Sequence, residues 1–161
     1  MTESARIAEI RRVTIDDPLV EPLLRELTHE YTRRYGPSGQ VEMTRYPADA
    51  FAEPHGLLLL LLEDGEPVAG GAYKRYDRHT AELKRMWTAS AHRRRGLARR
   101  VLAELERAAL AAGYRRVFLT TGPLQPEARG LYLAAGYTPL FDVSADPVAV
   151  GPLPFEKHLF H

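Results

Sequence analysis

A run of basic residues between an apolar stretch and a helix-like stretch could bind an anion. Residues 93–95 are all arginine, and Gly96 follows them at the start of a segment whose apolar residues recur at helical spacing. The first backbone N–H groups of a helix lack helical acceptors and lie at the positive end of its dipole, so they attract phosphate oxygens. Gly96 and the small Ala98 leave the backbone accessible, and Arg99 could add charge-assisted hydrogen bonds. The sequence therefore predicts a pyrophosphate site at this turn.

The net charge of +1 conceals a basic centre. Residues 73–116 contain 13 Lys and Arg against 4 Asp and Glu, a net of +9, and the rest of the chain carries −8. Such a centre indicates a phosphate or nucleic-acid ligand, although a solvated charged face would give the same count. We rank nucleic-acid binding last, because no helix-turn-helix, zinc-finger or RRM signature and no interleaved aromatic residues accompany the charge.

Several other chemistries have no residues to support them. The chain has no cysteine, which excludes disulfides, thiolate metal sites and cysteine nucleophiles. It has no Gly-x-Gly, no GxxxxGK[ST], no GxSxG and no HExxH sequence, so no dinucleotide fold, P-loop, serine hydrolase or metal site is predicted. The longest apolar run, residues 57–62, is far shorter than the roughly 20 residues of a membrane helix. Because no secretory signal is evident either, we expect a cytoplasmic protein with no membrane partner.

The elements that must position the basic turn form a mixed α/β pattern. We expect one domain over residues 1–161, a typical single-domain length. A strand at 7–13 precedes a helix that enters through Pro18 and ends at Gly36, and three strands at 57–63, 68–76 and 81–88 form a meander. The helix 96–112 and the strand 116–120 continue the last of these as a right-handed strand–helix–strand unit with parallel strands. A helix at 126–135 and strands at 137–141 and 155–160 follow.

The segment TAELKRMWTASAHRRRGLARRVLAELERAALAAGYRRVFLTT carries a family resemblance. Arg93-x-x-Gly96-x-Ala98 resembles the Arg/Gln-x-x-Gly-x-Gly/Ala signature of the GNAT superfamily of acetyl-CoA-dependent N-acetyltransferases. The stretches AELKRMWT, PEARGLYLAAGY and PFEKHL are similar to the family's fourth strand, late helix and final strand, so the match covers nearly the whole chain. It implies an α/β (α+β) fold: a mixed, mostly antiparallel sheet of six or seven strands, flanked by about four helices, with a central parallel unit that binds the cofactor.

The resemblance also implies where acetyl-coenzyme A binds. Its pantetheine arm would lie between the strand that ends at Thr88 and the strand 117–120, which splay apart, and its pyrophosphate would meet the N–H groups of the arginine turn. The implied cofactor-binding residues are Met86, Trp87, Thr88, Arg93, Arg94, Arg95, Gly96, Leu97, Ala98 and Arg99. For the arginines, a solvated basic turn is the alternative interpretation.

Two residues are the implied catalytic groups for direct transfer to a primary amine in a ternary complex. Tyr132 would protonate the departing thiolate, although its helical spacing also fits a core aromatic. Glu82 would take the amine proton through water, or would instead pair with a neighbouring Lys or Arg. His79 is a further candidate base. A backbone N–H at residues 86–88 would stabilise the oxyanion. Many relatives have Asn where Gln125 and its neighbours stand, so a side-chain contact to pantetheine there is in doubt.

The acceptor is the least defined part of this interpretation. Family members shape its site from segments that correspond to residues 31–46 and 142–154. Residues 1–66 carry a net charge of −6, which favours a cationic amine such as a polyamine, lysine or aminoglycoside. We rank a small-molecule amine above a protein N-terminus or lysine. The alternative function is a non-catalytic acyl-CoA sensor. Dimers are common among similar proteins, and the sequence leaves a homodimer open.

Overall fold

A seven-stranded sheet is the centre of the computed structural model, which describes residues 7–38, 43 and 48–160. The strand order is β1-β2-β3-β4-β5-β7-β6, and every pair is antiparallel except β4 and β5. The strands are β1 (Ala8–Val13), β2 (Leu57–Glu63), β3 (Glu66–Asp77), β4 (Thr80–Thr88), β5 (Arg116–Thr121), β6 (Thr138–Pro139) and β7 (Leu153–His158). The α-helices with stated bounds are α1 (Glu21–Tyr35), α3 (Leu97–Ala111), α4 (Pro126–Ala134) and α5 (Pro147–Val150). The fold expected from the sequence is confirmed.

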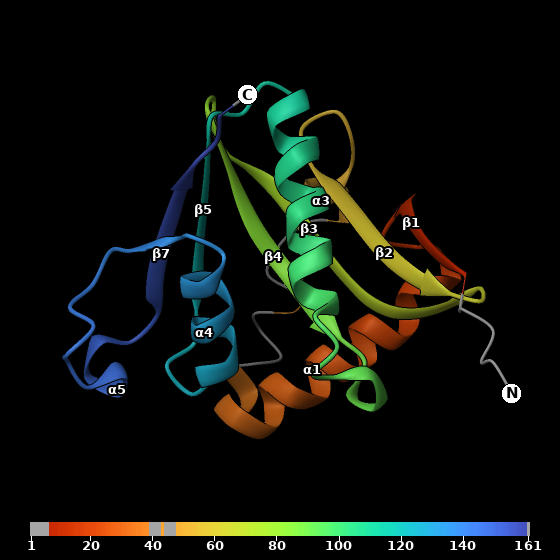
Figure 1. Cartoon of the computed structure of the whole chain (residues 1–161). Helices are drawn as coiled ribbons and strands as arrows, with labels where there is room; N and C mark the ends of the chain where they lie inside the picture. The colour runs from red at the N-terminus through yellow and green to blue at the C-terminus, as the bar shows by residue number, and fades with distance from the viewer. Residues whose placement is uncertain (1–6, 39–42, 44–47, 161) are drawn as a thin grey trace, which may run out of the picture.

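Helices cover both faces of the sheet, as the leucines of β2 show. The odd-numbered leucines pack in one buried cluster with Val101 and Leu105 of α3, and the even-numbered leucines pack in a second with Leu23 and Leu27 of α1. Successive side chains of a strand point to opposite faces, so an unbroken apolar strand requires cover on both sides. In Figure 1, α3 lies across one face and α1 crosses the ends of the strands.

The parallel strands β4 and β5 separate along their length. They are in register from Thr80 opposite Arg116 to Glu82 opposite Phe118, and then diverge toward their C-terminal ends (Figure 1). A register shift between β3 and β4 lies just beyond the last of these pairs, where Arg85 adopts a left-handed φ of 60°. Gly71 faces this irregularity, since a Cβ there would overlap Sδ of Met86. The bulge bends β4 away from β5 and opens a wedge between them.

The C-terminal part of the chain differs from the sequence prediction. The expected strand 137–141 contains only the two residues of β6, and a turn follows in which Ser144 bonds the Asp142 carboxylate. The expected strand 155–160 is instead β7, which begins two residues earlier than predicted. The stretch between β6 and β7 contains α5, which Asp146 caps by accepting a hydrogen bond from Val148 N.

No helix among the described residues is both long and apolar enough to cross a membrane.

Candidate active site

An open groove of about 550 Å³ runs from the turn before α3 to α4. Of the ten residues expected to bind the cofactor, all but Arg95 line it: Met86, Trp87, Thr88, Arg93, Arg94, Gly96, Leu97, Ala98 and Arg99. The far wall comes from α1 and α4. The end of β4, the basic turn and the first turn of α3 therefore share one surface.

The turn before α3 exposes its backbone. Gly96 is the N-cap of α3 with a φ of 73°, and Arg94 is also left-handed at 65°. No atom lies within 4 Å of an ideal Cβ built on Gly96, so this position faces open space. The first N–H groups of a helix have no acceptor within it, and here they lie beside the groove. This arrangement can receive an anion.

The arginine side chains of this segment lie in two places, at the groove and at the end of β2. Arg93 Nη2 lies 3.5 Å from Glu30 Oε2, and Arg99 Nη2 donates to Ala134 O at 3.1 Å, so both stay at the groove. Arg95 points elsewhere, because its guanidinium binds Glu63 in a bidentate pair at 2.9 and 2.5 Å. Arg95 thus ties the turn to the end of β2, and its side chain lies outside the groove lining.

Glu26 of α1 fixes the end of β4. It accepts a hydrogen bond from Trp87 Nε1 at 2.9 Å, and from the backbone N and Oγ of Ser90 at 3.2 and 3.0 Å. Burial acts to raise the pKa of Glu26, but these hydrogen bonds outweigh it and lower the pKa below its usual value. Sequence reasoning missed this residue, since its partners are 61 and 64 positions away.

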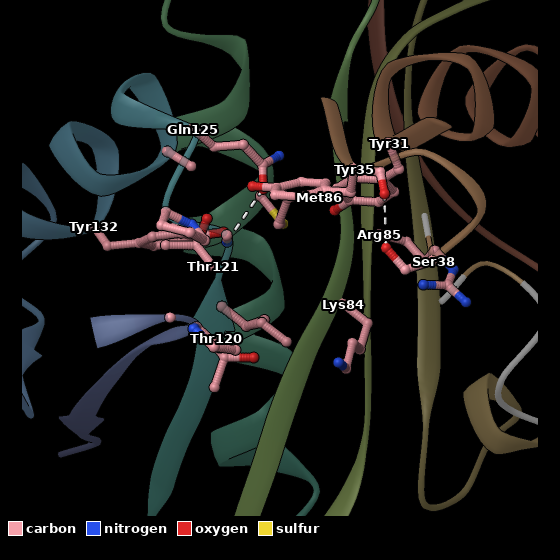
Figure 2. Close-up of a pocket in the computed structure, with 16 residues that line it drawn as sticks. Tyr31, Tyr35, Ser38, Lys84, Arg85, Met86, Thr120, Thr121, Gln125 and Tyr132 are labelled. Atoms are coloured by element: carbon pink, nitrogen blue, oxygen red, sulfur yellow. Dashed lines mark hydrogen bonds between the residues drawn. The ribbon is translucent and has the colours of Figure 1, made fainter. Parts of the chain in front are cut away.

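A second cavity, of about 450 Å³, lies at the wedge between β4 and β5. It shares Met86, Gln125, Ala128 and Tyr132 with the groove, so the two spaces meet at α4. Figure 2 shows Tyr132 on one side of this cavity, with Tyr31, Ser38 and Arg85 on the other.

Tyr132 lies where groove and cavity meet. Its side chain is 5% exposed, and its ring packs against Tyr137 and Phe155 with centroids 5.5 and 5.8 Å away. Burial raises the pKa of Tyr132 well above its usual range, so the phenol keeps its proton at neutral pH. Within the described ranges no hydrogen bond joins its hydroxyl to another residue. The ring is therefore a core aromatic whose edge also lines the site.

Glu82 and His79 do not share this location. The carboxylate of Glu82 pairs with Lys74 Nζ at 3.2 Å and Lys84 Nζ at 3.7 Å, in the part of β4 still joined to β5. The cross-strand alternative considered for Glu82 is thus present, and the residue is not part of either lining. His79 lies before Thr80, at the opposite end of β4 from the wedge.

The loop between β5 and α4 contacts α1 closely. Tyr35 belongs to the expected acceptor segment 31–46, and Gln125 is where the side-chain contact to pantetheine was in doubt, whereas Gly122 and Leu124 were not among the expected site residues. Tyr35 Oη accepts a hydrogen bond from Leu124 N at 3.2 Å and donates to Gln125 Oε1 at 3.4 Å. Gly122 allows this close approach, because a Cβ on it would overlap the Tyr35 hydroxyl unless the Tyr35 side chain moved. The Gly-Pro pair directly after an apolar strand was the available signal for such a close approach. Gln125 also accepts from Gly122 N, so its amide oxygen is used within the loop.

Residues 23–137 match the acetyltransferase (GNAT) family model. The chain belongs to the GNAT family. Over 93 residues it is 37% identical to the uncharacterized N-acetyltransferase YsnE of Bacillus subtilis (strain 168). The alignment covers 54% of this chain and 62% of YsnE, which is less than two thirds of that protein.

The GNAT fold is also evident from solved structures. A GNAT-family acetyltransferase from Staphylococcus aureus Mu50 superposes with a TM-score of 0.73 at 13% identity, over 96% of this chain and 100% of that one. The PaiA N-acetyltransferase of Thermoplasma acidophilum, in complex with coenzyme A, superposes with a TM-score of 0.68 at 16% identity, over 94% and 99%. At these identities the likeness shows the fold.

Among the described residues no group of three side chains that could hold a metal ion occurs.

Proposed function

We propose that this GNAT protein transfers an acetyl group from acetyl-coenzyme A to a primary amine of a small molecule. The observation that carries the proposal is the meeting of an open, amide-lined groove with a separate cavity at the wedge between β4 and β5, with Tyr132 at their junction. Such an arrangement allows donor and acceptor to enter from different sides and react in one ternary complex. The coenzyme A bound to the T. acidophilum protein of the same fold supports the choice of donor.

The groove fits the donor's phosphates and its arm. The N–H groups from Gly96 to Arg99 would bind the pyrophosphate, and the side chains of Arg93, Arg94 and Arg99 would add positive charge at its edge. Beyond Glu82, the described part of β4 has no register partner in β5. Backbone groups of residues 86–88 can therefore pair with the amide groups of pantetheine, as another strand would.

Transfer forms one bond and breaks another. The amine nitrogen bonds the acetyl carbon, and the bond from that carbon to sulfur breaks. A backbone N–H of residues 86–88 stabilises the oxyanion. Tyr132 gives its proton to the sulfur, and the amine proton passes through water to Glu82. Glu82 must accept this proton while it is paired with Lys74 and Lys84. A proton returned through solvent from Glu82 restores Tyr132.

Acetyl-coenzyme A binding is the first test. Binding to the native state must raise Tm, so a clear shift is expected once the ligand far exceeds a micromolar Kd. An unchanged Tm at that concentration would remove the cofactor assignment.

Thiol release across an amine panel is the second test. We expect release that depends on both acetyl-coenzyme A and an amine. Binding of acetyl-coenzyme A without release for any amine would identify the protein as an acyl-CoA sensor instead.

A further inference from the structure

The described lining of the cavity at the wedge is cationic and rich in hydroxyl groups. Lys84 and Arg85 of β4 contribute positive charges, and hydroxyls come from Tyr31, Tyr35, Ser38, Thr120 and Thr121. No Asp or Glu is among the described residues that line it. Figure 2 shows Lys84 and Thr120 on neighbouring strands at the base of the cavity, with Arg85 beside Ser38.

Both cations are held in place by their surroundings. Lys84 Nζ lies 3.7 Å from Glu82 Oε2, and the same carboxylate also pairs with Lys74. Arg85 is 5% exposed; its guanidinium lies 5.5 Å from the centroid of the Phe51 ring and donates to Met43 O at 3.2 Å. A guanidinium is planar and carries five N–H donors, of which Arg85 uses one for Met43 O.

None of the described acidic residues of the first 66 positions lines this cavity. Glu21 pairs with Arg25, and Glu30 pairs with Arg34 and Arg93. Glu26 is occupied by Trp87 and Ser90. The charges of these three glutamates are therefore compensated along α1 and beside the groove. The net charge of residues 1–66 thus does not reflect the described lining of the cavity.

Resting on the proposed function, we propose that the acceptor is an amine that also carries a carboxylate, as an α-amino acid does, and that Lys84 and Arg85 bind this carboxylate. The fork of Arg85 suits a carboxylate, and Lys84 adds a second positive charge from the same strand. A polycationic amine would instead meet two charges of its own sign in a half-enclosed space. This reverses the charge preference drawn from the sequence.

The same cations help to prepare the nucleophile. Positive charge beside an amine disfavours its protonated form and lowers its pKa. An acceptor whose carboxylate is bound at Lys84 and Arg85 would therefore present a larger fraction of neutral amine to the thioester, the form that can attack.

Matched ligand pairs test the proposal, with binding as a readout besides turnover. The binding assay is calorimetry on the coenzyme A complex, in which each N-acetyl amino acid of a panel is compared with its carboxamide. The turnover assay is thiol release, in which each amino acid is compared with its amide and with a polyamine. We expect the carboxylate member of the best pair to be preferred by about tenfold or more in Kd and in kcat/KM.

Two variants and a control locate the preference. Lys84→Gln should reduce the acid-to-amide ratio to within about threefold, and Arg85→Lys, which keeps the charge but loses the fork, should reduce it partly. Arg107→Gln removes an exposed cation of α3 that pairs with Glu104, and it should leave the ratio unchanged. A coenzyme A-induced rise in Tm shows that each variant is folded.

Three outcomes would overturn the inference: amides or polyamines equal to or better than acids, no binding of any acid in the panel, or an unchanged ratio in Lys84→Gln. If polyamines were acetylated and amino acids were not, the inference about the carboxylate would be overturned and the proposed function would stand. Failure to bind acetyl-coenzyme A would overturn the proposed function itself.

Discussion

At the scale of single residues, Tyr132 combines a packed ring with a hydroxyl that we propose takes part in the transfer. Tyr132→Phe removes only the hydroxyl, so the contacts with Tyr137 and Phe155 should persist. We expect kcat to fall roughly tenfold or more with the Kd for coenzyme A nearly unchanged, because a proton donor acts on the leaving sulfur and not on the phosphates. Steady-state kinetics and calorimetry measure the two quantities.

Tyr137→Phe is the matched control. It deletes a hydroxyl from the neighbouring ring, where Tyr137 Oη donates to Glu106 at 2.8 Å, outside the described linings of groove and cavity. Loss of this hydrogen bond should lower Tm, and kcat should be unchanged. Equal kcat in Tyr132→Phe and the parent protein would contradict the proton-donor role.

The raised pKa of Tyr132 also predicts a pH profile. Its phenol keeps its proton beyond the usual tyrosine value of about 10. The rate should therefore rise with pH as the acceptor amine loses its proton, and Tyr132 should cause no decrease below about pH 10. A decrease in rate between neutral pH and about pH 10 that disappears in Tyr132→Phe would contradict the raised pKa of Tyr132.

Gly96 tests the phosphate site with a second glycine as control. Gly96 and Gly113 have φ values of 73° and 101°, and an ideal Cβ on either meets nothing within 4 Å. Leucine at either position should destabilise the fold by a similar amount, on the order of 1–2 kcal/mol, because left-handed backbone disfavours a side chain. Only Gly96→Leu should also weaken coenzyme A binding by about tenfold or more, since its side chain enters the groove. Equal affinity in the two variants, measured by calorimetry, would refute the phosphate site.

At the scale of elements, Glu26 joins α1 to the end of β4. Glu26→Gln should lower Tm at neutral pH and weaken coenzyme A binding, because Trp87 lines the groove beside Thr88. Since the folded-state pKa of Glu26 is lowered, its stabilising contribution is present above the unfolded value and is lost as pH falls through the folded value. The Tm difference between the proteins should therefore shrink below about pH 4.

Glu21→Gln supplies the comparison for this element. Glu21 forms only an exposed pair with Arg25 one helical turn away, a type of contact that contributes little. Its Tm should stay close to that of the parent at every pH. A Tm loss in Glu26→Gln that is no larger, or that grows on acidification, would show that the hydrogen bonds to Trp87 and Ser90 do not fix β4.

Most helices and strands could be predicted from the sequence, because their signals are local patterns of a few residues. Pro18 begins a 3-10 turn that leads directly into α1, and Gly36 ends that helix. The wedge was expected only through the family resemblance, although the adjacent glycines of β3 are a local sign of the bulge that opens it. The bond from Trp87 to Glu26 and the pair of Arg95 with Glu63 join distant positions that no short-range pattern connects.

At the scale of the whole molecule, the basic centre of the sequence does not form one patch. Arg93, Arg94 and Arg99 line the groove, whereas Arg107 pairs with Glu104 and Arg116 with Glu156. The net charge of +9 therefore combines arginines that line the groove with arginines that pair with glutamates elsewhere, so it overestimates the charge of the proposed anion site. Chain-wide counts cannot separate these groups, because pairing depends on the fold.

This division predicts how coenzyme A affinity responds to salt. Exposed charges are screened within about 10 Å at 0.1 M salt, so Kd should rise severalfold when ionic strength increases about tenfold. Arg93→Gln should weaken binding at low salt and show a shallower salt dependence, because Arg93 is 54% exposed in its pair with Glu30 and can turn to a phosphate. Arg107→Gln, with the same change in net charge, should follow the parent at every salt concentration. Parallel slopes for all three proteins in calorimetry would mean that the backbone amides of α3 bind the phosphates without help from Arg93.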